Sequence, residues 1–404
     1  MKKLIVALAA ALAIIAAAIT WNDIQKKSVE AEDTQIPAQT EEAAELQEAA
    51  EEEPAAEEAE TEVYESESID YDAIYASHAP DEVVMTVDGR DVTWDEYYYW
   101  LEYFGETAEY YAMMYSYYGY DASIADFAPQ IKESAEEQIK AFASIEKFGA
   151  ENSVELTEEE LQEIEDGIKT AVEEEFGEDS EENRKAYYEE LGVTEDMYMR
   201  LSRINYIYQD GIYALYGEDF EKITEEEITA WLEENEYMYA SHILLATMDL
   251  GTMEELEDSE KEEKKALAEE LAAELQAISD SEKLIARFNE LKEEYCEDTG
   301  KAAYPDGYVF LTGEMVEEFE NGYKALEDYQ VSDPVLSDYG YHIIIRLPLS
   351  PEMVMEYSDN GDPLTARQEY ANETYGTLMD TLMEEVECSI SDSIESLDIT
   401  QYIV

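Results

Sequence analysis

Two of the only three histidines in this chain of 404 residues stand at the start of similar apolar runs. His242 lies in YMYASHILLA, and His342 lies a hundred residues later in DYGYHIIIRL. Short apolar runs of this kind are typical of buried strands, where a histidine is usually a hydrogen-bonded core residue. An imidazole can also set the polarity of a site or move a proton. The repetition in so histidine-poor a chain favours a shared role for the two rings.

Other chemistry-bearing patterns are weak. Cys296 and Cys388 lie far apart and lack metal-ligand spacing, so Cys296 is expected to be a small buried residue, and a single disulfide between the two is the less favoured alternative. The acidic stretch at 359–369 places its glycine too early for a calcium loop. No phosphate loop, dinucleotide fingerprint or G-x-S-x-G occurs. The sequence therefore predicts no metal and no cofactor.

The charge balance excludes one class of partner. The chain carries 103 acidic against 24 basic residues, a formal net charge of −79. Such a field repels nucleic acid and anionic headgroups and attracts cations or basic partners. We therefore expect no nucleic-acid binding.

The first 80 residues predict export rather than a folded domain. Residues 1–21 combine Lys2 and Lys3 with an unbroken apolar run from Leu4 to Ile19, which is typical of a cleaved signal peptide or an uncleaved membrane anchor. Both place the remaining chain outside the cytoplasm. Residues 22–80 are acidic and of low complexity, which predicts a disordered linker.

Residues 81–236 predict a mainly helical domain. Asp88-Gly89 is a hairpin signal, and three T-x-x-E capping boxes open helical patterns; their threonines are Thr93, Thr157 and Thr224. The stretch at 109–127 is rich in tyrosine and methionine. It either packs the core of this domain, which we slightly favour, or presents an adaptable binding surface.

The pattern changes after Tyr237. Residues 237–348 alternate strand and helix signals, whereas residues 349–404 are again mainly helical. The predicted fold class is therefore α+β, with an α/β domain inserted into a mainly helical one.

Three motifs of the α/β segment resemble a known family: ASHILLA at the start, GEMVEEFE in the middle, and VSDPVLSDYGYHIII at the end. They resemble the parvulin-type peptidyl-prolyl isomerases, and residues 81–400 more diffusely resemble the extracytoplasmic foldases of the PrsA/SurA type. The resemblance implies a parvulin-type isomerase domain within a helical chaperone domain. It also implies unfolded secreted polypeptides with X-Pro bonds as partners and leaves a homodimer open. The membrane is a further partner if the N-terminal apolar segment stays uncleaved.

Carried over residue by residue, the resemblance assigns a site. It implies that His242 and His342 share a hydrogen bond beneath the pocket and that Asp298 lies beside the twisting amide. The residues that it places around the bound substrate are Phe310, Met315, Phe319, Ser337 and Asp338.

The chain departs from the family pattern where a Gly-x-Leu-Gly is usual. PDGYVF stands there, so that Gly307 and Tyr308 replace a pocket leucine and a glycine. This departure leaves open a holdase whose isomerase domain only binds. A second alternative, from the acidity alone, is a cation-binding spacer protein at the cell surface.

Overall fold

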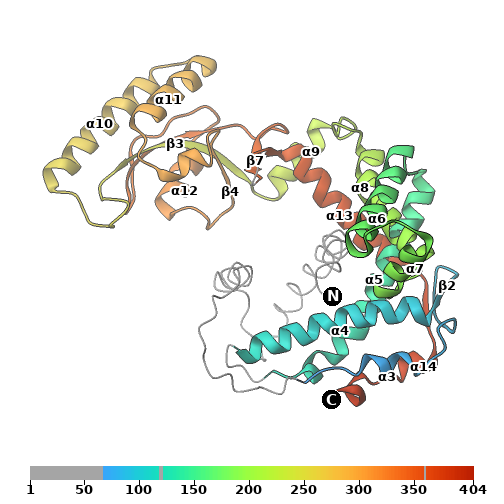
Figure 1. Cartoon of the computed structure of the whole chain (residues 1–404). Helices are drawn as coiled ribbons and strands as arrows, with labels where there is room; N and C mark the ends of the chain where they lie inside the picture. Colours follow the sequence, from blue (N-terminus) through green and yellow to red (C-terminus); the bar gives the residue numbers. More distant parts are fainter. Residues whose placement is uncertain (1–66, 118–121, 359–360) are drawn as a thin grey trace. The chain divides into compact units, whose positions relative to one another are not determined.

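A computed structural model describes residues 67–117, 122–358 and 361–404 of the chain, which divide into two compact units (Figure 1). The first unit runs to Ala214 and resumes at Gly376, and the second is Leu215–Tyr375. In sequence, the second unit therefore interrupts the first. The predicted leader and most of the predicted linker lie outside the described residues. Within the described ranges, no helix is long and apolar enough to cross a membrane.

The first unit combines long helices with a small sheet. The sheet has the order β2-β1-β9 and joins the hairpin of β1 (Val83–Val87) and β2 (Arg90–Thr93) to β9 (Cys388–Ile390) near the C-terminus. The predicted turn at Asp88-Gly89 is confirmed, because both residues have positive φ. The helices of this unit are α3 (Tyr71–Tyr75), α4 (Trp94–Tyr117), α5 (Ile124–Asn152), α6 (Glu158–Phe176), α7 (Glu181–Glu190), α8 (Glu195–Tyr216) and α14 (Asp392–Glu395).

Two of the three predicted capping boxes form. Thr157 caps α6, and Thr224 caps α9 (Glu225–Glu234). In each box the threonine hydroxyl accepts from the N–H of the glutamate three residues later, and the glutamate carboxylate accepts from the threonine N–H. The predicted capping box of Thr93 and Glu96 is wrong. The Glu96 carboxylate instead forms ion pairs with Arg90 and Arg200, at 2.7 Å in both cases. A charged hydrogen bond to a guanidinium outcompetes one to a backbone amide.

The predicted linker extends too far at its C-terminal end. Residues 67–80 contain α3, in which Ile74 is fully buried. Ile69 forms an antiparallel bridge with Ile403, and His78 lies against Trp94 with ring centroids 4.4 Å apart. The few apolar side chains of this segment pack against the C-terminal turn and the start of α4. The acidic composition of the segment gives no indication of these contacts.

The second unit is built around a four-stranded antiparallel sheet of order β4-β3-β6-β5. Its strands are β3 (Met238–Ala246), β4 (Tyr308–Phe310), β5 (Val335–Leu336) and β6 (Gly340–Arg346). Its helices are α9, α10 (Asp258–Gln276), α11 (Ser281–Tyr295), α12 (Glu317–Lys324) and the short 3₁₀ turn η1 (Thr299–Ala302). A hairpin of β7 (Val354–Tyr357) and β8 (Pro363–Thr365) leads into α13 (Ala366–Glu385), within which the chain returns to the first unit.

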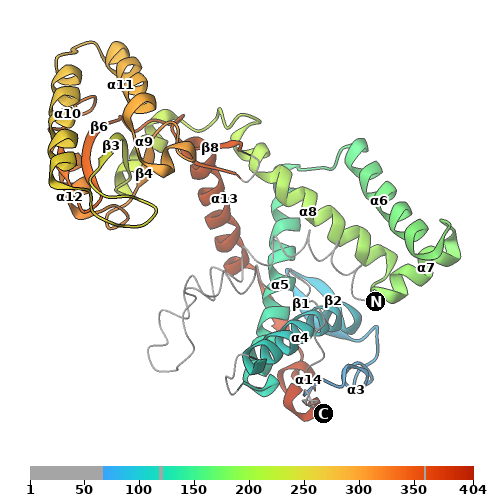
Figure 2. The same ribbon diagram turned by 60° about the vertical axis from the view of Figure 1, so that its left-hand side comes forward.

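Side chains of the two central strands, β3 and β6, alternate between the two faces of the sheet, and both faces are buried. Ile243, Leu245, Ile343 and Ile345 pack against α10 and α11, which lie side by side (Figure 2). Ala240 and Ile344 point the other way, toward Phe319 and Tyr323 of α12. Because side chains alternate along a strand, His242 and His342 share this second face.

We predict that Gly340→Ala destabilises the protein by about 2–4 kcal/mol. Gly340 opens β6 with φ of +148°, and a Cβ there would lie 2.3 Å from the backbone oxygen of Leu245. Gly376→Ala in α13 is the matched control, because its Cβ would meet nothing within 4 Å and alanine favours a helix. Urea unfolding of both variants measures the difference. Equal stabilities would contradict the proposed close approach of β6 to β3.

Candidate active site

The register of β3 and β6 brings the two histidines together. His242 is paired with Ile344, and Leu244 with His342, so that the two imidazoles are diagonal neighbours on one face. Their Nδ1 atoms are 3.0 Å apart, and the two rings lie edge to edge, with centroids 5.2 Å apart and planes 11° from parallel. Both side chains are buried. The hydrogen bond implied by the family resemblance is therefore present.

The far nitrogen of each ring also has a partner. His242 Nε2 lies 2.9 Å from Asp298 Oδ2, and His342 Nε2 lies 2.7 Å from Ser337 Oγ. The backbone N–H of Tyr339 donates to the same serine oxygen at 3.2 Å. Asp298, His242, His342 and Ser337 thus form one continuous chain of hydrogen bonds.

Asp298 receives donors at both carboxylate oxygens. The Tyr308 hydroxyl and His242 share Oδ2, and the backbone N–H of Gly300 donates to Oδ1 at 3.0 Å. Burial opposes the charge of Asp298, but these three donors outweigh it and hold the pKa of its carboxyl well below the usual range. Asp298 is consequently an acceptor only.

An ionised Asp298 determines the proton positions along the chain of hydrogen bonds. Its carboxylate accepts a hydrogen bond from Nε2–H of His242, and when that ring is neutral its Nδ1 is an acceptor. His342 then donates from its own Nδ1 and accepts at Nε2 from the Ser337 hydroxyl. Protonation of His242 would reverse the last two bonds, since its Nδ1 would become a donor. While His242 is neutral, the Asp298 carboxylate therefore sets the direction of every bond in this chain.

The second histidine is held neutral. Burial, followed by the proximity of His242, lowers the pKa of His342 to about 3. A neutral ring with both nitrogens satisfied supports its neighbour and does not exchange protons near neutral pH. This arrangement favours orientation and polarity as the role of the pair.

A buried apolar cluster, named the socket after its proposed role, adjoins the histidines. The ring of Phe319 is buried, and it meets both imidazoles edge-on, with centroids 5.3 Å from His242 and 5.5 Å from His342. Phe310 packs edge-to-face on Phe319 at 5.8 Å. Met315, partly buried, belongs to the same cluster. The four-residue spacing of Met315 and Phe319 in the sequence predicts that they share one helix face. This prediction is wrong, because α12 begins at Glu317 with Val316 as its cap, and Met315 precedes it.

The structure thus brings together seven of the eight residues that the resemblance assigned. His242, Asp298, His342 and Ser337 form the polar chain, and Phe310, Met315 and Phe319 form the adjoining socket. Asp338 is exposed next to Ser337, and no described contact links it to the network. Its assignment stays a prediction.

Three residues at or near the site were not assigned to it from the sequence. Tyr308 binds Asp298; it had been noted only as a departure from the family pattern. Cys296 is buried beneath β3, as predicted, and burial raises the pKa of its thiol. Lys292 is 3% exposed and reaches Ser241 Oγ at 3.1 Å; one lysine among many helical charges carries no signal that would identify it.

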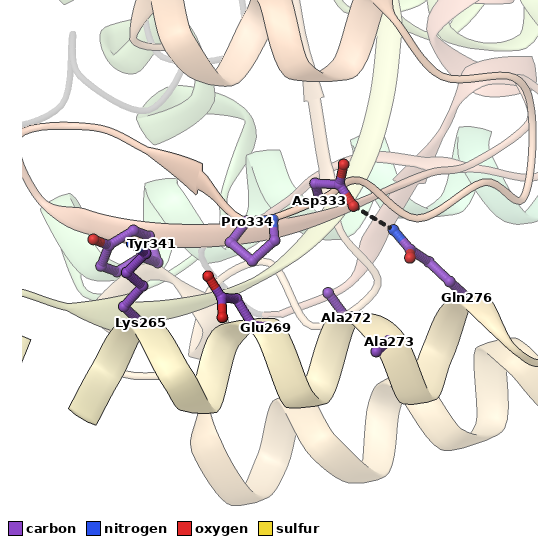
Figure 3. A pocket seen from close by; sticks show the side chains of 8 residues that line it. All are labelled: Lys265, Glu269, Ala272, Ala273, Gln276, Asp333, Pro334 and Tyr341. Atoms are coloured by element: carbon purple, nitrogen blue, oxygen red, sulfur yellow. Dashed lines mark hydrogen bonds between the residues drawn. The ribbon is translucent and has the colours of Figure 1, made fainter. Parts of the chain in front are cut away.

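A surface pocket of about 390 Å³ lies elsewhere in this unit, between α10 and the turn at Asp333 and Pro334 (Figure 3). Tyr341 lines it and alternates with His342 along β6, so that the pocket opens on the face opposite the histidines. Gln276 crosses one end and donates to Asp333 Oδ1 at 3.1 Å (Figure 3). Nothing described in this pocket belongs to the histidine site. Across the described ranges, no group of three or more side chains is arranged to hold a metal ion.

Comparison with known proteins agrees with this geometry. Residues 242–347 match the model of the rotamase family, described as a PPIC-type PPIase domain. The foldase protein PrsA of Oceanobacillus iheyensis is 33% identical over 197 residues, which are 48% of this chain and 54% of that protein. PrsA of Halalkalibacterium halodurans is 30% identical over 234 residues, 56% of this chain and 62% of that protein.

A crystal structure of the peptidyl-prolyl isomerase PrsA from Bacillus cereus also matches, at 20% identity and a TM-score of 0.28, covering 69% of this chain and 94% of that one. The matched regions cover 54% and 62% of the two curated PrsA proteins, so the chain spans little more than half the length of these relatives. It contains a PPIC-type domain, and the resemblance to parvulin-type, PrsA-like foldases that the sequence indicated is confirmed.

We predict that His342 makes the protein less stable in acid. Its lowered pKa means that the unfolded chain, with an ordinary value of 6.5, binds the proton more tightly than the folded one. Stability is therefore lost as the pH falls below about 6.5 and continues to fall until about 3. Between pH 7 and pH 5 the loss from this residue is about 2 kcal/mol.

Urea unfolding of the wild type and His342→Gln at pH 7 and pH 5 measures this contribution. The wild type should lose more stability than the variant, whatever the variant costs at pH 7. Asp298 does not interfere, because its contribution is lost only near and below its ordinary pKa of 3.8. Equal slopes for wild type and His342→Gln would refute the prediction.

Proposed function

We propose that residues 237–348 catalyse cis/trans isomerisation of X-Pro peptide bonds in unfolded polypeptides outside the cytoplasm. The observation that carries this proposal is the juxtaposition of the polar chain from Asp298 to Ser337 with the aromatic socket of Phe310 and Phe319. An X-Pro bond presents the matching pair of features, an apolar ring and a polar amide.

The chemistry requires no covalent step. Amide resonance sets a rotation barrier of about 18–20 kcal/mol, and a pocket lowers it by binding the twisted amide better than the planar one. The socket would fix the proline ring, while the charge of Asp298 favours the altered electron distribution of the twisted bond. His242 and His342 would orient Asp298 and set the local polarity. Neither a cofactor nor a metal is needed for this reaction.

For the whole chain we propose a foldase that both holds and isomerises exported polypeptides. The exposed end of α4 supports this proposal: Tyr110, Tyr111 and Met113 are about half exposed, and Tyr117 is 84% exposed, whereas Ala108 and Ala112 face the core. Tyrosine and methionine adapt to varied partners. The proposed domain plan consists of a leader at 1–21, a chaperone domain at 81–236, the isomerase at 237–348, and a helical segment at 349–404, whose residues 376–404 pack on the chaperone domain. Residues 215–236 and 349–375 group with the isomerase in one compact unit. An uncleaved leader would anchor the chain to the membrane.

One alternative has a specific observation in its favour. Gly307 and Tyr308 replace the residues usual at the proline pocket, and Tyr308 points to Asp298. If this change blocks the twisted amide, the unit would bind X-Pro segments without turning them over, and the protein would act as a holdase.

We predict that the chain from residue 22 onward accelerates isomerisation of X-Pro peptides in a protease-coupled assay. Asp298→Asn should lower kcat/KM about 10- to 100-fold, because one electrostatic group in a shielded site commonly contributes on this order. Asp258→Asn, at the exposed start of α10, is the matched control and should match the wild type.

The same preparation would be tested for suppression of the aggregation of a denatured client. Suppression without isomerisation would replace the isomerase proposal with the holdase. A protein inactive in both assays would rule out the foldase, and equal losses in the two aspartate variants would remove Asp298 from the site.

A further inference from the structure

We propose that Tyr308 is a positioning residue of the isomerase site, whose phenol holds the Asp298 carboxylate in one orientation and keeps its charge beside His242. This inference rests on the isomerase function proposed above. It assigns a role to Tyr308, which has a phenol where the family pattern usually has a glycine.

Tyr308 lies on the catalytic face of the sheet. Its strand β4 pairs with β3, and Tyr308 stands opposite Ala240, two residues from His242 on the same face. The phenol ring meets the His242 imidazole edge-on, with centroids 5.4 Å apart and planes at 81°. Its hydroxyl donates to the same Asp298 oxygen that accepts from His242. One carboxylate oxygen is thus fixed from two sides.

Two glycines make room for this arrangement. A Cβ on Gly300 would lie 2.4 Å from the Tyr308 hydroxyl. A Cβ on Gly307 would lie 2.7 Å from the backbone oxygen of Ala240, where β4 approaches β3. The leucine usual in the family at position 307 would therefore not fit this backbone, so the glycine and the tyrosine belong to one arrangement.

The loop that precedes Tyr308 is anchored by three side chains. The buried ammonium of Lys292 donates to the carbonyl of Pro305 at 3.1 Å and to that of Tyr304 at 3.5 Å. Tyr239 donates its hydroxyl to the Asp306 carbonyl at 3.0 Å, and Tyr357 donates to the Asp306 carboxylate. A group held this firmly is pre-organised for a fixed polar contact.

The surroundings of Asp298 show what the phenol adds. Its charge is opposed by burial and supported by the donors His242, Tyr308 and Gly300, of which only the histidine and the phenol are side chains. The ionisable groups around it come from every neighbouring element; they are His242 of β3, Tyr308 of β4, Lys292 of α11, Cys296 at the C-cap of that helix, Lys301 of η1 and His342 of β6. Removal of the phenol leaves His242 as the single side-chain donor.

The test compares Tyr308→Phe with Tyr304→Phe. The first variant keeps the ring against His242 and loses the hydroxyl, and the second loses a hydroxyl from the neighbouring ring, 4.8 Å away, that has no described bond to Asp298. We expect Tyr308→Phe to lower kcat/KM about 3- to 10-fold at pH 7, mostly through kcat, and to move the loss of activity on acidification to higher pH. Tyr304→Phe should follow the wild-type profile.

Histidine ring signals in NMR give a readout that does not depend on activity. With only three histidines in the chain, the rings of His242 and His342 can be assigned by substitution and followed during acidification. In Tyr308→Phe, but not in Tyr304→Phe, the ring signals of His242 should differ from those of the wild type, because Asp298 Oδ2 keeps only one of its two side-chain donors. This measurement remains decisive if the wild type proves inactive, an outcome that would overturn the proposed function alone.

A wild-type pH profile and unchanged ring signals in Tyr308→Phe would overturn the positioning role. If that variant fails to fold, Gly300→Ala replaces it, because the added methyl displaces the hydroxyl and leaves the phenol in the chain. The same shifts would then support the role, and their absence would refute it.

Discussion

The site depends on the register between β3 and β6. These two strands are adjacent in the sheet, although a hundred residues separate their histidines, and they pair over seven residues from Ala240 to Ala246. A slip of one residue would turn one imidazole from the Phe319 side to the α10 side. The opposite face prevents such a slip, because Ile243, Leu245, Ile343 and Ile345 are all buried there. Packing on one face of the sheet therefore maintains the chemistry on the other.

The charge of Asp298 then determines the direction in which the hydrogen bonds of the site run. A single ionised carboxylate, Asp298, orders the protons through two imidazoles to a serine hydroxyl. The cost of burying so many polar atoms is offset because each finds a partner. The strong negative charge of the chain contributes little to this order, since most carboxylates of the described residues are exposed and screened.

The sequence predicted the parts of this fold that follow from local patterns and failed where distant residues decide. The two histidine strands, the caps at Thr157 and Thr224, and the Asp88-Gly89 turn were confirmed. Strands of two or three residues, such as β4 and β5, carry too little periodicity to be recognised. Glu96 left its predicted cap for arginines that only tertiary structure brings near. The bond between Tyr308 and Asp298 depends on space at Gly300 and Gly307, which no local pattern reveals.

The second unit begins and ends at neighbouring points. Close to its two boundaries, the Tyr216 hydroxyl donates to Thr374 Oγ1 at 3.1 Å, and Trp231 of α9 packs edge-on against Tyr370 of α13. A segment whose ends meet can be gained or exchanged by a host fold with a small entropic cost of loop closure. Residues 215–375 have the geometry of a transferable module. Evolution can therefore replace or duplicate this unit while the first unit keeps the sheet that joins its own N- and C-terminal strands.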